Sequence, residues 1–453
     1  MNKLLPLAIA ALLSGCSLVP EYFRPAPPAP AQWPEKVDAG KTAMPADWRG
    51  YFADPALQAL IAAALEHNRD MAIAVARVEE ARTLAGLARA DRFPRVDVGV
   101  QQQAAQAPAD LSAARRETVT RRYDANLGVV AFELDFWGRV ASLDAAARAS
   151  FLASEYAREA FRLSLIAEVA SAWYALAEFD ERLALAEATV VSREESRRLI
   201  EKRRDVGLAG DMDFYAADGA WAAARAETAN LARQRAAAAN ALRLLVGADV
   251  AVLPAPTWGK LPEIAVGLPA DVLLRRPDVL AAEQKLIAAN ANVGAARAAF
   301  LPKIVLTATA GTASAALSGL FGAGSGAWSF VPLLKWPLFD AGHSEASVDL
   351  AEARKHVAVA EYEKAIQQAF REVADLLAAR RYYAEQAVAL ERAVAAQTER
   401  LKRVEARHHA GVSSYLELLD AQREHFAARQ AALAARRAEA AAGAWLFKAL
   451  GGA

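Results

Sequence analysis

The chain has 453 residues, of which 55% are hydrophobic, and its 53 basic side chains equal its 53 acidic ones. Because no basic excess is present to neutralise phosphate groups, the composition gives no support for a nucleic-acid-binding function. The single cysteine, Cys16, has no partner for a disulfide within the chain and argues against a cysteine zinc site.

The first sixteen residues have the features of a lipoprotein signal. Lys3 precedes an apolar run from Leu4 to Leu13 that is too short to span a bilayer. The run ends in Leu-Ser-Gly-Cys, which resembles the bacterial lipobox, whose cysteine becomes the acylated first residue of the mature protein. We therefore predict that residues 1–15 are removed and that Cys16 carries the lipid anchor. An ordinary cleavable signal with an incidental cysteine is the alternative.

Residues 16–50 are rich in proline, which favours an extended backbone, and we expect them to form a tether from the anchor. A helical pair should follow from residue 51 and end at Pro94, where proline forbids helix continuation. Residues 96–101 and, after a polar loop, residues 123–129 alternate between apolar and polar side chains, which predicts a strand hairpin at about 94–136. Such alternation is required of a strand in a membrane barrel, although a soluble hairpin with one buried face has the same pattern. After the signal we find no run of roughly 20 apolar residues, so any membrane crossing is expected to use strands.

The longest predicted element is a helical hairpin at residues 139–246. Before it, Trp137 suits a membrane boundary, and Gly138 permits a sharp bend from strand to helix. About 65 residues without proline follow, and a helix of that length reaches roughly 100 Å. Their apolar residues recur in steps of three and four, which predicts a seam packed against similar helices. Gly207 marks the turn to the returning helix.

The second half of the chain repeats the first. The sequence ARAAFLPKIVL at 296–306 matches ARADRFPRVDV at 88–98, an offset of 208 residues. Two pairs of glycines are also spaced alike, at an offset of 204 residues: Gly138 with Gly342, and Gly207 with Gly411. Such internal similarity indicates a structural repeat.

The repeat predicts the domain organisation. Residues 51–246 form repeat 1, and a linker with several prolines occupies 247–268. Repeat 2 covers 269–453. Its strand hairpin is expected at about 302–340, starting at Pro302 and with its second strand at about Trp328–Phe339, and its helical hairpin at 343–450. The glycine-rich segment at 319–326 lacks Gly-Lys-Ser/Thr, and we interpret it as a surface loop rather than a phosphate site.

The number of strands requires more than one chain. One chain supplies four candidate membrane strands, whereas closed bacterial barrels have roughly eight or more, because open edges are not tolerated in lipid. We therefore expect a mainly helical protein with a β membrane segment. Several chains would share two walls, one of strands and one of helices.

Several motifs resemble a known family: FELDFWGR (132–139), LPADVLLRRPD (268–278), NANVGAARAAFLP (290–302) and YLELLDAQR (415–423). With the repeat and the lipobox, they resemble the outer-membrane efflux factors, the TolC-like channels, and within these the lipoprotein branch. The resemblance covers nearly the whole mature chain. It departs from the family pattern at LFDAGH (338–343), where a second glycine and an arginine are common, and this affects only a corner.

The resemblance implies a homotrimer in the outer membrane, with a twelve-stranded β-barrel, an equatorial region containing the linker, and a twelve-helix periplasmic α-barrel. It implies a passive conduit that is anchored to outer-membrane lipid. Its partners would be a periplasmic adaptor protein and an inner-membrane pump of the proton-driven type. We expect no enzyme activity, because no constellation of acid, base and nucleophile occurs in the sequence. We also expect no cofactor, metal or nucleic acid.

By the same resemblance, the turn of the second helical hairpin closes the tunnel. Leu416 and Asp420 lie four residues apart on one helix face and match the leucine and aspartate rings of the family. Three copies of each would form an apolar plug beside a ring that attracts cations. A solvated surface aspartate is the alternative for Asp420. Asp211 and Asp213 are candidates for bonds between chains at the tip of the first hairpin.

Two other functions fit parts of the sequence. A periplasmic lipoprotein adaptor would also have a long helical hairpin, but only one, set between small β-domains. The outer-membrane component of a type I secretion system shares the resemblance to a channel. The cargo stays open among drugs, metals, solvents and polypeptides, although the lipoprotein branch favours multidrug pumps.

Overall fold

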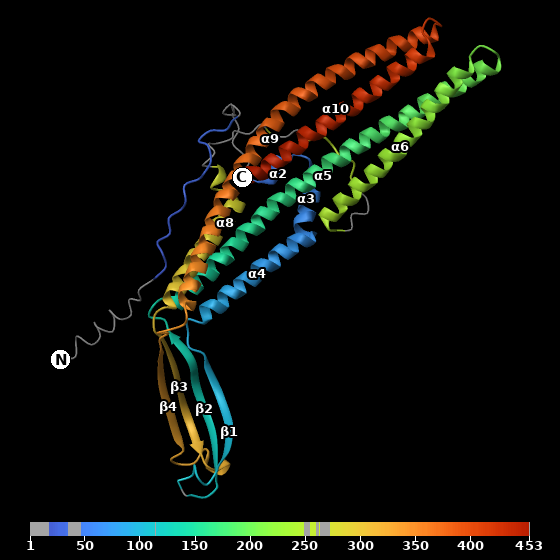
Figure 1. The fold of residues 1–453 in the computed structure, drawn as a ribbon. Helices are drawn as coiled ribbons and strands as arrows, with labels where there is room; N and C mark the ends of the chain where they lie inside the picture. The colour runs from blue at the N-terminus through green and yellow to red at the C-terminus, as the bar shows by residue number, and fades with distance from the viewer. Residues whose placement is uncertain are drawn as a thin grey trace. The chain divides into compact units, whose positions relative to one another are not determined.

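The computed structural model describes residues 18–34, 47–113, 115–248, 254–259, 262 and 272–452. Cys16 and the predicted cleavage position therefore lie outside the described residues, as does most of the linker. The described chain is mainly helical and divides into two compact units (Figure 1). Four helices have residues in both units: α4 (Arg69–Ala90), α5 (Arg139–Asp205), α8 (Pro277–Ala298) and α9 (His343–His409).

The first unit, residues 1–26, 78–155 and 281–362, contains an antiparallel sheet in the order β1-β2-β3-β4 (Figure 1). The strands are β1 (Val96–Ala107), β2 (Thr118–Leu134), β3 (Lys303–Ser314) and β4 (Gly326–Lys335). The central pair, β2 and β3, comes from different halves of the chain and is in register from Tyr123 opposite Ser314 to Leu134 opposite Ile304. The two halves of the chain thus meet within one sheet.

The last strand is shorter than the sequence suggested. We expected it to reach about Phe339, but β4 ends at Lys335, just before Trp336 and Pro337. Lys335 pairs with Lys303, the first residue of β3, so no partner strand extends beyond it. The loop between β3 and β4 contains a single 3₁₀ turn, η1 (Leu317–Gly319).

The second unit comprises residues 27–77, 156–280 and 363–453, and its described part is mainly helical. Besides the long segments of α5 and α9, it contains α2 (Trp48–Tyr51), α3 (Pro55–His67), α6 (Asp211–Val246) and α10 (Tyr415–Ala449). Asp54 begins α3, because its side chain accepts a hydrogen bond from the Ala56 amide at 2.8 Å. Asn68 separates α3 from α4, accepting from the Met71 amide at 2.9 Å and donating to the Leu245 carbonyl at 2.8 Å.

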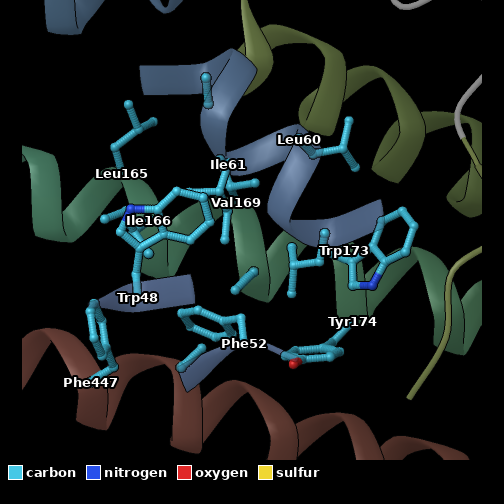
Figure 2. Close-up of a cluster of buried hydrophobic side chains, with 14 of the residues drawn as sticks. Trp48, Phe52, Leu60, Ile61, Leu165, Ile166, Val169, Trp173, Tyr174 and Phe447 are labelled. Atoms are coloured by element: carbon cyan, nitrogen blue, oxygen red, sulfur yellow. The ribbon is translucent and has the colours of Figure 1, made fainter. Parts of the chain in front are cut away.

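The main core lies in this second unit. Leu165, Ile166, Val169 and Trp173 of α5 are almost fully buried against residues of α2, α3 and α10, as Figure 2 shows. This packing explains one departure from the sequence analysis. By length and composition alone, α5 is apolar enough to cross a membrane, which we had not expected of any segment after the signal. More than half of the most apolar 18-residue stretch of α5 is buried inside the protein, so we attribute its apolar character to the core.

Candidate functional site

One face of the sheet is apolar and exposed. The register places Val98 opposite Leu127, Leu127 opposite Ala310, and Ala310 opposite Trp328, so all four side chains lie on the same face. Val98 is 77% exposed and Trp328 is 80% exposed. An exposed apolar surface of this extent marks contact with a partner or with lipid.

The opposite face of the sheet is mainly polar, although Val331 and Leu333 of β4 also lie on it. Asp124 is buried there and pairs with Arg122 at 2.8 Å. Further along this face, the hydroxyl groups of Thr309 and Ser329 form a hydrogen bond of 2.7 Å between β3 and β4. A sheet that is apolar on one face and polar on the other suits a wall between lipid and a water-filled lumen.

The corners between strands and helices bring predicted residues together. The Trp137 indole N–H donates to the Pro302 carbonyl at 2.8 Å, and this bond joins the start of α5 to the start of β3. Gly138 and Gly342 have φ values of +71° and +85°, a conformation that favours glycine. Pro94 lies between the end of α4 and the start of β1.

Acidic residues at these corners were not identified from the sequence. Glu133 of β2 accepts two hydrogen bonds from Arg139, at 2.8 and 2.7 Å, and pairs with Lys303 at 2.7 Å. Asp135 accepts a hydrogen bond from the Ala141 amide at 2.7 Å, and Asp340 caps the start of α9 in a similar way. An acid that precedes a helix by a few residues was the available signal, since carboxylates stabilise helix starts.

The two helical turns have the same backbone geometry. Gly207 follows α5 with φ +75°, and Gly411 follows α9 with φ +74°. After each glycine, the next amide bonds back to the helix, from Leu208 to the Arg203 carbonyl at 2.7 Å and from Val412 to the Arg407 carbonyl at 2.9 Å. This is the left-handed glycine arrangement that closes many helices.

Leu416 and Asp420 both lie on the first turns of α10. The Leu416 side chain is 71% exposed. Asp420 is not a free surface acid, because its carboxylate pairs with Arg400 of α9 at 2.5 Å, in an exposed ion pair. The signal for this partner was its distance from the turn, since Arg400 lies about as far before Gly411 as Asp420 lies after it.

Asp211 and Asp213 occupy the first turn of α6, where both are exposed and where acidic groups stabilise the helix start. The corresponding start of α10 uses Ser414 instead, whose hydroxyl accepts from the Glu417 amide. His408 belongs to the second turn, with its Nδ1 at 3.0 Å from the Ser413 carbonyl oxygen. In the described part of the chain, no group of three or more His, Cys, Asp and Glu side chains is placed to hold a metal ion.

Comparison with known proteins assigns these features to one family. The sequence model for "Outer membrane efflux protein" matches residues 60–248 and 268–452. The toluene efflux pump outer membrane protein TtgF of Pseudomonas putida is 43% identical over 463 residues, covering 99% of this chain and 96% of TtgF. Outer membrane protein OprJ of Pseudomonas aeruginosa is 43% identical over 453 residues, covering 98% of this chain and 95% of OprJ.

A solved structure shares the fold. The open state of the MtrE outer membrane channel of Neisseria gonorrhoeae superimposes with a TM-score of 0.88 at 36% identity, covering 96% of this chain and 98% of MtrE. All three relatives are named as outer membrane proteins, TtgF as part of an efflux pump and MtrE as a channel, which favours the channel interpretation over the adaptor. Since the similarity spans nearly the whole chain in both sequence and fold, this protein belongs to the outer membrane efflux protein family.

Proposed function

We propose that this protein is the outer-membrane channel of a tripartite efflux pump and that it conducts substrates passively. The substrates would arrive from a periplasmic adaptor and a proton-driven inner-membrane pump. One observation carries the proposal: a sheet with an exposed apolar face lies on the same chain as two hairpins of very long helices. Lipid can cover the first, and the second suits the wall of a tunnel.

In this proposal the channel is a homotrimer, and each chain is built from a two-fold repeat. In the described chain the sheet has two unpaired edges, β1 and β4, and unpaired backbone groups are very costly in lipid. Pairing β4 of each chain with β1 of the next closes a barrel of twelve strands. The two matched segments of the family model, 60–248 and 268–452, support the repeat with its boundaries at 51–246 and 269–453.

The anchoring is also part of the proposal. Acylation at Cys16, after loss of residues 1–15, would hold the tether at 16–50 to the outer membrane. The sequence Leu-Ser-Gly-Cys supports this assignment. Mass spectrometry of the N-terminal peptide checks it: acyl chains on Cys16 are expected, and an unmodified Cys16 would exclude the anchor.

The periplasmic gate is assigned to Leu416 and Asp420 of α10. Three exposed Leu416 side chains around one axis would exclude water, and three Asp420 carboxylates would attract cations. The ion pair with Arg400 modifies this picture, since the guanidinium offsets part of the Asp420 charge. We therefore propose that Arg400 weakens the cation preference of the gate and ties α10 to α9. Asp211 and Asp213 would add contacts between chains at the other tip.

Planar-bilayer conductance of the purified channel tests the gate. Leu416→Ala should raise the single-channel conductance, because it removes the apolar plug. Asp420→Asn should lower the ratio of potassium to chloride permeability, whereas Arg400→Gln should raise it. Glu424→Gln is the matched control, an exposed acid one turn further along α10. The gate assignment fails if Leu416→Ala leaves the conductance unchanged and Asp420→Asn behaves like Glu424→Gln.

A further inference from the structure

Charged side chains that are buried in the described residues are, with one exception, held in ion pairs. Five such residues are less than 9% exposed: Asp124, Glu178, Arg193, Arg276 and Glu283. Glu178, for example, pairs with Arg182 at 2.9 Å and with Arg437 at 2.8 Å. Arg276 and Glu283 also have partners of opposite charge, as does Asp124. Arg193 alone among the five has no carboxylate partner in the described chain.

The surroundings of Arg193 leave its charge largely uncompensated. It is 8% exposed on α5, and its Nη1 donates to the Ala220 carbonyl of α6 at 3.0 Å. Its Nε is buried without a hydrogen-bond partner. Burial lowers the pKa of Arg193, Tyr415 raises it, and the positive charge of Arg423 lowers it. A guanidinium nevertheless keeps its proton in a protein, so an unpaired buried cation remains.

Arg193 lines a cavity of about 420 Å³ between α5, α6 and α10. Its walls are mostly apolar, formed by alanines of α5 and α6 and by Leu419 and Phe426 of α10. Arg423 is a second guanidinium in the lining, and Glu227 is the single carboxylate, so the lining has an excess of positive charge. A volume of this size falls in the range of small-molecule sites, which are largely apolar with a few placed polar groups.

We propose that this cavity binds a small amphiphilic organic anion, with its carboxylate on Arg193 and its apolar body against Leu419 and Phe426. Arginine pairs with carboxylates through two parallel hydrogen bonds, and Arg193 has no such pair in the described chain. An acidic side chain of a docked protein is the other class of occupant. The apolar walls favour the small molecule, because a carboxylate side chain alone would leave most of them uncovered.

A ligand in this cavity would contact α5 and α6 together with α10. Leu419 lies in the same first turns of α10 as Leu416 and Asp420. Occupancy would therefore hold α10 against the first hairpin and reduce the conductance of the channel. This consequence rests on the proposed gate, whereas the binding site itself does not.

The binding test uses 2-naphthoate and the purified full chain in detergent. Equilibrium dialysis should show saturable binding of one 2-naphthoate per chain, and 2-naphthylmethanol, which has the same ring and no charge, should bind at least tenfold more weakly. Arg193→Gln should weaken 2-naphthoate binding at least tenfold, and Arg423→Gln should weaken it severalfold. Arg233→Gln is the matched control on the exposed side of α6 and should bind as the unmodified protein does.

The same set of variants and ligands distinguishes the ways in which the proposal could fail. Equal binding by Arg193→Gln and Arg233→Gln would overturn the proposal, as would equal binding of the neutral analogue or no saturable binding. If Arg193→Gln does not fold, as judged by circular dichroism, Arg423→Gln decides. Saturable, Arg193-dependent binding that leaves the conductance unchanged would support the site and count against the proposed gate.

Discussion

Gly207 and Gly411 have the same backbone conformation at the two helical turns, and a Cβ at either position would meet no atom within 4 Å. The requirement for glycine is therefore conformational rather than spatial. A residue with a side chain is strained at positive φ, which costs roughly 1–2 kcal/mol. The equal spacing of these glycines in the two halves of the sequence already indicated that both form turns. This role was readable from the sequence because the positive φ depends on the glycine itself and not on packing against other elements.

Replacement of either turn glycine by alanine should lower the thermal unfolding midpoint. We expect a loss of about 1 kcal/mol per chain for Gly207→Ala and for Gly411→Ala. Gly219→Ala is the control, since Gly219 lies inside α6 with open space around it. Alanine is the better helix former there, so that variant should gain up to about 1 kcal/mol. Circular dichroism melts provide the comparison, and a loss in all three variants would refute the conformational explanation.

Arg276 is a buried residue whose role depends on its ion-pair partners. It is 2% exposed and pairs with Asp278 at 2.8 Å and with Glu372 at 2.6 Å, and Lys448 also pairs with Glu372 at 2.5 Å. Burial raises the pKa of Asp278, but the hydrogen bonds and charge of Arg276 outweigh it, so the net pKa lies below its usual value. The ionised carboxylate therefore stabilises the folded state.

This shift predicts the direction of a pH effect. A carboxyl group with a lowered pKa contributes its full stability above the unfolded value of about 4, and that stability is lost as the pH falls through the folded value. The midpoint temperature of thermal unfolding should therefore decrease as the pH is lowered below about 4. In the Asp278→Asn variant this temperature should decrease less steeply. Asp375→Asn, which removes an exposed pair with Arg371, should follow the unmodified protein. Identical slopes for Asp278→Asn and the unmodified protein would contradict this role.

At the scale of elements, the corners show what connects strands to helices. Trp137 bonds the Pro302 carbonyl at 2.8 Å from a partly buried position, whereas Trp336 bonds the Phe300 carbonyl at 3.1 Å from an exposed one. The first bond joins residues of the two halves of the chain. The second joins residues within the second half.

Trp137→Phe should therefore destabilise the protein more than Trp336→Phe. The first variant leaves a partly buried carbonyl without its donor, at a cost of about 1 kcal/mol or more, and the second should cost only a few tenths. Chemical denaturation followed by circular dichroism gives the comparison. Equal midpoints for the two variants would show that the corner does not depend on the indole bond.

Periodicity and glycine spacing located the long helices to within about a residue, as α5 and α9 illustrate. The pairing of β2 with β3 was not predictable in the same way, because alternation assigns faces but does not choose neighbours. The ion pairs of Asp420 with Arg400 and of Glu133 with Lys303 were missed for a related reason. Each pair depends on how two elements pack. Distance from the turn places Arg400 and Asp420 at a similar level of the hairpin, but it does not show that their side chains meet.

For the molecule as a whole, the decisive feature is the small number of strands. The described chain has one four-stranded sheet, with β1 and β4 at its edges and an apolar face exposed. Neither edge has a partner within that sheet, and an open edge is not stable in lipid. Other copies of the chain are the simplest partners, because three of them supply twelve strands.

The number of chains in the purified channel tests the account most directly. Native mass spectrometry of the complex released from detergent should give three copies of the mature chain, and the trimer should persist until the sheet signal is lost on heating. A stable monomer that retains its full sheet signal would contradict the shared barrel, and with it the proposed gate.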